Sequence, residues 1–251
     1  GRNDIFTYST AGISVYKNTS NLELSFVLKD SLLKNNTSGQ HIYVSPVDIP
    51  AIVDIDYDGD IDILTFDIAG GFVHYFKNTS IENYNNCEYL EFDFADGCWG
   101  DFYEGINTYT LNFNCQCTPI TNIYNNNKTK HAGSTLLAID VDNDNDRDLI
   151  LGDVSFNNLN LLINGGDNQN AIITSIDTAF PQNNLNTIAA DIHIFPSAYY
   201  IDASNDGVKD LIVTSNMRNN SENFKSCWLY ENSGTNTNPN FNFIQKDFLQ
   251  G

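Results

Sequence analysis

The sequence predicts an all-β fold built from repeated four-stranded antiparallel sheets, and three observations predict it. Three acidic segments, at 54–62, 140–148 and 202–210, place oxygen-bearing side chains on alternate residues around a turn. Each is followed by a short apolar run rich in β-branched residues, which is typical of a buried strand. A second apolar run ending in Asn then follows a turn, so the chain repeats a single unit.

The acidic segments predict calcium sites. Ca²⁺ binds about six to eight oxygen atoms, and a loop with oxygens at positions 1, 3, 5, 7 and 9 can surround one ion. Position 6 must turn sharply, and Gly59, Asn145 and Gly207 are residue types that tolerate positive φ. We expect position 7 to coordinate through its backbone carbonyl. The expected metal-binding residues are Asp54, Asp56, Asp58, Asp60 and Asp62; Asp140, Asp142, Asp144, Asp146 and Asp148; and Asp202, Ser204, Asp206, Val208 and Asp210.

These loops differ from EF-hands, which begin in the same way. An EF-hand closes with a bidentate Glu at position 12 and continues into a helix. Position 12 here is Thr65, Leu151 or Val213, and it lies in the apolar run that reads as a strand. We therefore expect the Asp at position 9 to close each loop and a strand to follow it.

A fourth, partial loop opens the chain. Residues 1–6 align with 59–64, so Gly1 takes position 6 and Asp4 takes the closing position. The second apolar run ends at Asn18, Asn78, Asn164 and Asn232, which makes four copies. Successive closing Asp residues are 58, 86 and 62 residues apart (62−4, 148−62 and 210−148), so a unit near 60 residues with one insertion explains the spacing.

Each unit has room for about four short strands joined by tight turns. The pairs Ala11-Gly12, Gly70-Gly71 and Asn157-Asn158 suit hairpin turns. Repeated four-stranded antiparallel units predict the blades of a β-propeller, with about four blades in this chain. The expected units are 1–50, 51–130 with a cysteine-containing insertion at 83–120, 131–195 and 196–251.

The loops and their repeats resemble the FG-GAP/VCBS repeats, the calcium-loop blades of integrin α-subunit heads and of many secreted bacterial proteins. The segments 99–100, 131–135 and 195–200 are similar to those of large FG-GAP proteins exported by Bacteroidota. Family members typically form seven blades, so the resemblance implies a partial ring or one completed by other segments of a longer protein. It also implies about three complete calcium sites and a fourth that is truncated, together with an extracellular, secreted or cell-surface location.

The charge balance excludes some partners. The chain has 12 Lys and Arg residues against 32 Asp and Glu, and 13 of those acids lie in the three complete loops. Nucleic-acid binding needs clustered basic residues, so we expect none. No apolar run approaches the ~20 residues that span a bilayer, so no membrane span is expected in this segment.

The expected insertion carries Cys87, Cys98, Cys115 and Cys117. Their spacings fit no standard zinc pattern, whereas an exported protein with a long excursion favours disulfides among these four residues. All three pairings stay open. The fifth cysteine, Cys227, is expected to be a buried strand residue.

Catalytic motifs are missing from the sequence, so we expect a protein that is not an enzyme. His131 and Ser134 could suggest a nucleophile, but a hydrogen-bonding role at a strand entry is preferred. Trp99, Phe102 and Tyr103 could stack on sugar rings, but a small core is preferred.

Three functions follow from these observations. The first is a calcium-stabilised extracellular module for cell adhesion, which binds an unidentified protein or glycan. The alternative is the propeller domain of a secreted, lyase-like polysaccharide-degrading enzyme, and a structural spacer is a third option.

Overall fold

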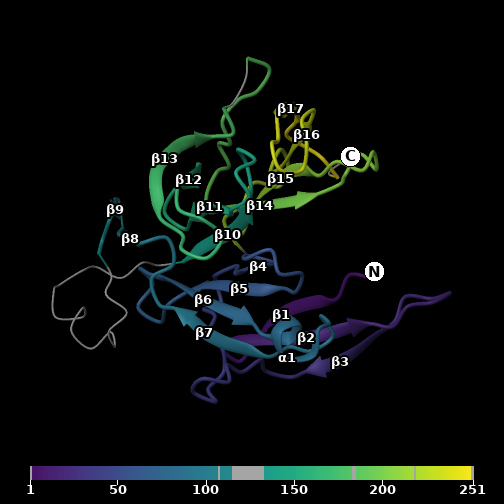
Figure 1. The fold of residues 1–251 in the computed structure, drawn as a ribbon. Coiled ribbons are helices and arrows are strands. Elements are labelled where there is room, and N and C mark those ends of the chain that lie inside the picture. Colours follow the sequence, from purple (N-terminus) through teal and green to yellow (C-terminus); the bar gives the residue numbers. More distant parts are fainter. Residues whose placement is uncertain (1, 107, 115–132, 183–184, 218, 250–251) are drawn as a thin grey trace.

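The computed structural model describes residues 2–106, 108–114, 133–182, 185–217 and 219–249 (Figure 1). The described part of the chain is almost entirely β structure, with one short helix, α1 (Ser80–Tyr84). The strands of the four main sheets are β1 (Ile5–Ser9), β2 (Gly12–Asn18) and β3 (Phe26–Asp30); β4 (Ala51–Val53), β5 (Asp62–Phe66), β6 (Val73–Asn78) and β7 (Phe92–Asp96); β10 (Ser134–Ile139), β11 (Asp148–Asp153), β12 (Leu159–Asn164) and β13 (Ile173–Phe180); and β14 (Pro196–Ile201), β15 (Asp210–Ser215), β16 (Cys227–Asn232) and β17 (Phe241–Gln245). A small hairpin, β8 (Phe102–Glu104) and β9 (Tyr109–Leu111), stands apart from them.

Each main sheet is an antiparallel meander whose strands pair in chain order (Figure 1). The fold is a β-propeller of four blades, which confirms the predicted fold class. The second, third and fourth blades have four strands, whereas the first has three. Within each four-stranded blade, the acidic loop joins the first strand to the second. The first blade begins at the strand that follows the loop, so β1 corresponds to β5, β11 and β15.

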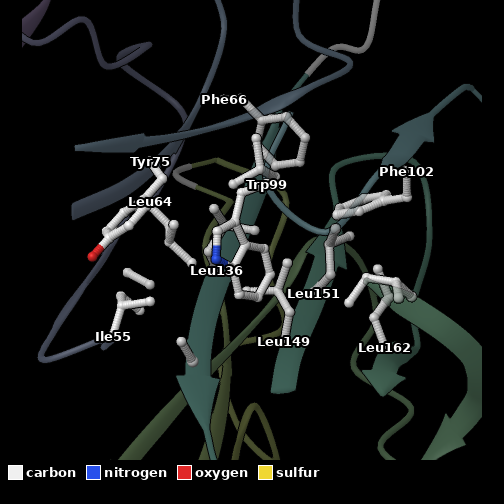
Figure 2. Close-up of a cluster of buried hydrophobic side chains, with 14 residues drawn as sticks. Ile55, Leu64, Phe66, Tyr75, Trp99, Phe102, Leu136, Leu149, Leu151 and Leu162 are labelled. Carbon is white, nitrogen blue, oxygen red and sulfur yellow. The ribbon is translucent and has the colours of Figure 1, made fainter. Parts of the chain in front are cut away.

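Apolar side chains pack between successive blades. One cluster joins the first and second blades through residues such as Val15 and Ile63, and another joins the third and fourth through Leu161 and Tyr230. Figure 2 shows the cluster between the second and third blades, where Phe66, Leu64 and Tyr75 approach Leu136, Leu149 and Leu151. The described residues form no apolar cluster between the first and fourth blades.

The turn between β1 and β2 is formed by other residues than the predicted pair Ala11-Gly12. Ser9 pairs with Gly12, so the two turn residues are Thr10 and Ala11, with φ of 47° and 63°. Positive φ at both central positions matches the twist of a hairpin, although these residue types rarely adopt it. Gly12 is instead the first residue of β2, where a Cβ would lie 2.6 Å from the Leu32 side chain.

The segment expected as an insertion is partly a blade strand. β7 lies inside 83–120 and pairs with β6, and α1 precedes it. Because β7 is the last strand of the second blade, the described part of the insertion begins only after Asp96. Trp99 and Phe102 are 4% and 0% exposed within the cluster of Figure 2, and Tyr103 packs edge-on against Phe72, as a small core requires.

The cysteines can be placed only in part. Cys87 is exposed and forms no disulfide, which removes it from the predicted set. Cys98 is buried, whereas Cys115 and Cys117 lie outside the described residues, so disulfide bonding in the rest of the set stays a prediction. Cys227 is a free cysteine and is half-buried at the start of β16, not fully buried as expected, and burial raises its pKa.

Candidate metal centres and the central groove

The three acidic loops are hairpin corners at the entrance to the second strand of each blade. Val53 pairs with Asp62, Ile139 with Asp148 and Ile201 with Asp210, so each closing Asp faces the residue that precedes position 1. A strand follows every loop, which agrees with the distinction from EF-hands.

Two residues of each loop adopt the left-handed backbone conformation. At position 6, φ is 105° at Gly59, 69° at Asn145 and 93° at Gly207. The same region is occupied at position 4, where Tyr57 has φ of 62°. Asn143 and Asn205 take the equivalent conformation in the other two loops, at 65° and 60°. Position 4 was not predicted from the sequence: Asn143 and Asn205 are of a type that adopts positive φ, but Tyr57 is not.

The closing Asp ties each corner to its blade. In the second blade, one carboxylate oxygen of Asp62 accepts a hydrogen bond from the Asn78 backbone N–H at 2.8 Å, and the other accepts one from Ile55 at 2.9 Å. The third and fourth blades repeat both bonds, from Asn164 and Val141 to Asp148 and from Asn232 and Ala203 to Asp210. Among the described residues of the first blade, only the first bond is present, from Asn18 to Asp4 at 2.7 Å. This shared contact explains why Asp recurs at the closing position. Asn recurs for another reason: its side-chain oxygen accepts backbone hydrogen bonds, as Asn78 does from Ser80 and Glu91 and as Asn164 does from Gly166 and Ile172.

Carboxylate oxygens converge in two of the loops. Ligand atoms of Asp54, Asp56 and Asp58 lie within 4.8 Å of one another, and so do those of Asp140, Asp142 and Asp148. In the loop at 202–210, which is fully described, no such group of three forms. There Ser204 takes position 3 in place of an Asp, and Asp202 accepts hydrogen bonds from the backbone of Asp206 and Gly207, at 3.1 and 3.0 Å.

Several of these oxygens are buried without a hydrogen-bond partner. Both carboxylate oxygens of Asp146 and one each of Asp54 and Asp60 are in this condition. Asp146 and Asp60 are each only 2% exposed. Leaving a buried carboxylate unpaired is costly, and a cation that binds oxygen would remove the cost. These orphaned atoms and the all-oxygen donor set fit Ca²⁺.

The pKa values agree with a cluster that lacks sufficient positive charge. Burial is the main cause that raises the pKa of Asp146 and Asp148 to about 7, and neighbouring carboxylates such as Asp144 add to it. Burial likewise raises the pKa of Asp62 to about 7 and that of Asp60 to about 6. A bound cation would favour the ionised form of all four.

Two residues at the acidic loop 54–62 of the second blade were not predicted from the sequence. The Lys77 ammonium contacts the carboxylates of Asp56, Asp58 and Glu82, at 3.2 Å from Asp58 and 2.5 Å from Glu82. Glu82, on α1, also groups with Asp58 and Asp60 as a candidate ligand. The repeat offers no signal for either residue. The residues in the place of Lys77 are Lys17, Ile163 and Glu231, and α1 was not predicted.

Neighbouring loops contact one another. The Arg147 guanidinium lies 4.2 Å from the centre of the Tyr57 ring, and its Nε donates to the Asp54 carbonyl at 3.0 Å. The Tyr57 hydroxyl donates to the Asp146 carbonyl at 3.2 Å, and the Asn168 side chain donates to the Asp56 carbonyl at 2.9 Å. The loops of the second and third blades therefore form one connected surface.

The inner strands of the blades border a groove of about 700 Å³, called the central groove below. Tyr57, Arg147 and Lys209, from the acidic loops, also line it. Its lining residues are Phe6, Thr7, Tyr8, Ile13, Val44, 48–53, Tyr57, 136–139, Arg147, 198–201, Lys209, Asn236 and Thr237. The described lining combines tyrosines and aliphatic side chains with two basic residues and contains no histidine.

Ser134 has a structural role in the described part of the chain. Its hydroxyl donates to the buried carboxyl of Glu104 at 3.2 Å, and its backbone N–H donates to Asp48 at 3.0 Å. Burial raises the pKa of Glu104 well above its usual value. His131, the other half of the proposed nucleophile pair, lies outside the described residues.

No family model and no curated protein matches the chain, so the resemblance to FG-GAP/VCBS repeats stays a prediction. Among solved structures, one similar chain is a lectin from Agrocybe aegerita that recognises non-reducing terminal N-acetylglucosamine. The identity is 14% and the TM-score is 0.37; the match covers 98% of this chain and 64% of the lectin chain. This chain therefore spans less than two thirds of the length of that structure. Within the described residues, no helix is long and apolar enough to cross a membrane.

Proposed function

We propose that this protein is a calcium-stabilised, extracellular β-propeller module that binds a protein or a glycan and belongs to the FG-GAP/VCBS repeats. The observation that carries the proposal is Asp146, which is 2% exposed and has no hydrogen-bond partner among the described residues for either carboxylate oxygen. A buried carboxylate in this state needs a cation or a proton.

Calcium has a structural role in this proposal. The ions hold corners that also contribute Tyr57, Arg147 and Lys209 to the central groove. Bound ions therefore keep these side chains in position, and ion removal loosens the groove together with the blades. The loops at 54–62 and 140–148, whose carboxylates already converge, are the stronger sites.

The central groove is the proposed ligand site. Tyr8 and Tyr199 are 44% and 39% exposed there, and flat aromatic faces can stack on sugar rings or on peptide side chains. Arg147 and Lys209 add donors that suit hydroxyl or carboxylate groups. A binding role is preferred to the lyase-like alternative, because a lyase is expected to gather His, Arg, Lys and Tyr in a groove, whereas the described lining has two basic residues and no histidine.

Calorimetric titration of the metal-free protein with Ca²⁺ tests the metal part of the proposal. We expect heat from at least two sites and a higher melting temperature in Ca²⁺ than in EDTA. An identical melt under both conditions would count against calcium.

A glycan array and a screen of extracellular-matrix proteins, each run in Ca²⁺ and in EDTA, test the ligand part. We expect calcium-dependent binding that Tyr199→Ala weakens. Tyr84→Ala is the matched control, because Tyr84 is equally exposed but lies on α1 outside the groove. Turnover of an acidic polysaccharide would instead support the lyase-like alternative.

A further inference from the structure

One ammonium group lies among the candidate metal ligands of the second blade. The side chain of Lys77, on β6, contacts three carboxylates. They belong to Asp56, Asp58 and Glu82, and each of these residues is in a group whose ligand atoms could hold a metal ion. We propose that Ca²⁺ binds at this corner by taking the place of the Lys77 ammonium, and that Glu82 becomes a calcium ligand from outside the acidic loop. This inference rests on the proposed calcium site at 54–62.

The distances leave no room for both cations. The Lys77 Nζ lies 3.2 Å from the Asp58 carboxylate and 2.5 Å from that of Glu82. Ca²⁺ binds oxygen at about 2.3–2.6 Å, so an ion on the same oxygens would lie within about 6 Å of the ammonium. The Asp56 side chain is only 3% exposed, so water screens the repulsion between two cations poorly at this corner. The ammonium therefore has to leave when the ion binds.

The helix α1 brings Glu82 to the corner and leaves one buried oxygen unsatisfied. The backbone N–H of Ile81 donates to one carboxylate oxygen of Asp60 at 2.9 Å, which holds the helix beside the loop. The other oxygen of Asp60 has no hydrogen-bond partner among the described residues, and Asp60 is only 2% exposed. Ligand atoms of Asp58, Asp60 and Glu82 lie within 4.8 Å of one another. The Lys77 ammonium does not satisfy this oxygen, whereas an ion that binds six to eight oxygens can also take it.

The third blade has no lysine at its corner. The residue in the place of Lys77 is Ile163, and in the described part of the chain no Lys or Arg side chain forms an ion pair with a carboxylate of 140–148. Arg147 lies in that loop, but its guanidinium stacks on Tyr57. Calcium binding therefore adds a cation to the third blade, whereas in the second blade it exchanges one cation for another. Lys77 thus holds the second corner when calcium is scarce and raises the calcium concentration needed to fill it.

A calcium titration that reads the two loops separately tests the exchange. A chelator buffer sets the concentration of free Ca²⁺. The NMR signals of the Gly59 and Asn143 backbone amides, which donate to loop carboxylates, report the loops at 54–62 and 140–148. We expect Lys77→Met to bind Ca²⁺ about tenfold more tightly at 54–62, because no ammonium has to be displaced. Binding at 140–148 should be unchanged.

Lys17→Met is the matched control for this variant. Lys17 is exposed and precedes Asn18 on β2, as Lys77 precedes Asn78 on β6. Its replacement removes the same charge from the chain and should leave both affinities unchanged. Unchanged or weaker binding at 54–62 in Lys77→Met would overturn the exchange, because the ammonium would then stay beside the ion.

The added ligand is tested in the Lys77→Met protein. Glu82→Gln in this background removes a carboxylate that no longer has a lysine partner, so the change in affinity reports its contact with Ca²⁺. Binding at 54–62 should weaken by about tenfold, because calcium affinity depends on the number of charged ligands. Glu88→Gln, at an exposed position outside the loops, should leave it unchanged. Unchanged binding after Glu82→Gln would overturn the assignment of Glu82 as a ligand.

Amine labelling of the unmodified protein tests the exchange without any variant. Acetic anhydride should modify Lys77 faster in Ca²⁺ than in EDTA, because the displaced amine meets the solvent. Lys17 is the internal reference and should react equally under both conditions. Equal labelling of Lys77 would overturn the exchange and would leave the calcium site itself standing if the Gly59 amide still responded to Ca²⁺. No response of Gly59 in any of these proteins would overturn both the inference and the calcium site at 54–62.

Discussion

The guanidinium of Arg147 stacks on the ring of Tyr57, 4.2 Å from its centre, and so joins the acidic loops of two adjacent blades. Tyr57 holds its ring there from a left-handed backbone position, with φ of 62°. Burial is the main cause that raises its pKa to about 12, and its hydroxyl donates a hydrogen bond to the Asp146 carbonyl. Loop geometry and packing between the blades are thus coupled through one pair of side chains.

Removal of the Arg147 side chain is expected to weaken the junction between the second and third blades. Arg147→Ala removes the ring contact and the hydrogen bond to Asp54, which together contribute about 1–2 kcal/mol. For a chain of this size the melting temperature should fall by roughly 2–8 °C. A double-mutant cycle with Tyr57→Ala measures the coupling, and strictly additive losses would contradict it.

Loss of one ligand in the third blade should remove part of the calcium effect. The carboxylate of Asp142 groups with Asp140 and Asp148, so Asp142→Asn should weaken this site. An ion present at about 100 times its Kd stabilises the folded state by about 2.7 kcal/mol, or roughly 5–11 °C in melting temperature. The difference between melts in Ca²⁺ and in EDTA should shrink by about that amount in the variant.

Glu88→Gln is the control for the loss of negative charge, since Glu88 is exposed and lies outside the loops. This variant should keep the full calcium effect. If Asp142→Asn also kept the full calcium effect, the prediction of a calcium site at 140–148 would be wrong.

Local sequence patterns predicted the blades, but they could not predict contacts between residues that are far apart in the sequence. The spacing of Asp54 to Asp62 and the apolar run after it lie within a dozen residues, so the hairpin corner and its following strand could be read from the sequence. Lys77 reaches Asp56 from 21 residues away, on a strand whose counterparts in the third and fourth blades carry Ile163 and Glu231. Thr10 and Ala11 form a turn that residue preference disfavours, and Gly12 instead takes the first position of β2, where a Cβ would lie 2.6 Å from the Leu32 side chain.

Lys77 should matter most when calcium is removed. Its side chain is 25% exposed and its ammonium contacts Asp56, whose side chain is 3% exposed, so its loss leaves a buried carboxylate without a cation. Lys77→Met should lower the free energy of unfolding in EDTA by about 1–3 kcal/mol, and hence the melting temperature by roughly 2–12 °C. In excess Ca²⁺ the loss should be smaller, because the ion supplies the missing charge. Equal losses under both conditions would show that Lys77 acts through packing alone.

Asp48 should make stability depend on pH. It precedes β4, lines the central groove and accepts a hydrogen bond from the backbone of Ser134, and burial raises its pKa to about 6. The folded-state pKa lies above the unfolded value near 4, so folding favours the protonated form. This contribution is fully present below about pH 4 and is lost as the pH rises through about 6.

Asp48→Asn keeps the acceptor oxygen without the charge. It should raise the free energy of unfolding by on the order of 2 kcal/mol at pH 8 and change it little at pH 4. Glu104, which shares Ser134 as a donor, is present in both proteins, so its own titration largely cancels in the difference. Urea unfolding of both proteins at the two pH values measures the effect. An equal change at pH 4 and pH 8 would assign it to packing, because the ionisation of Asp48 contributes only at the higher pH.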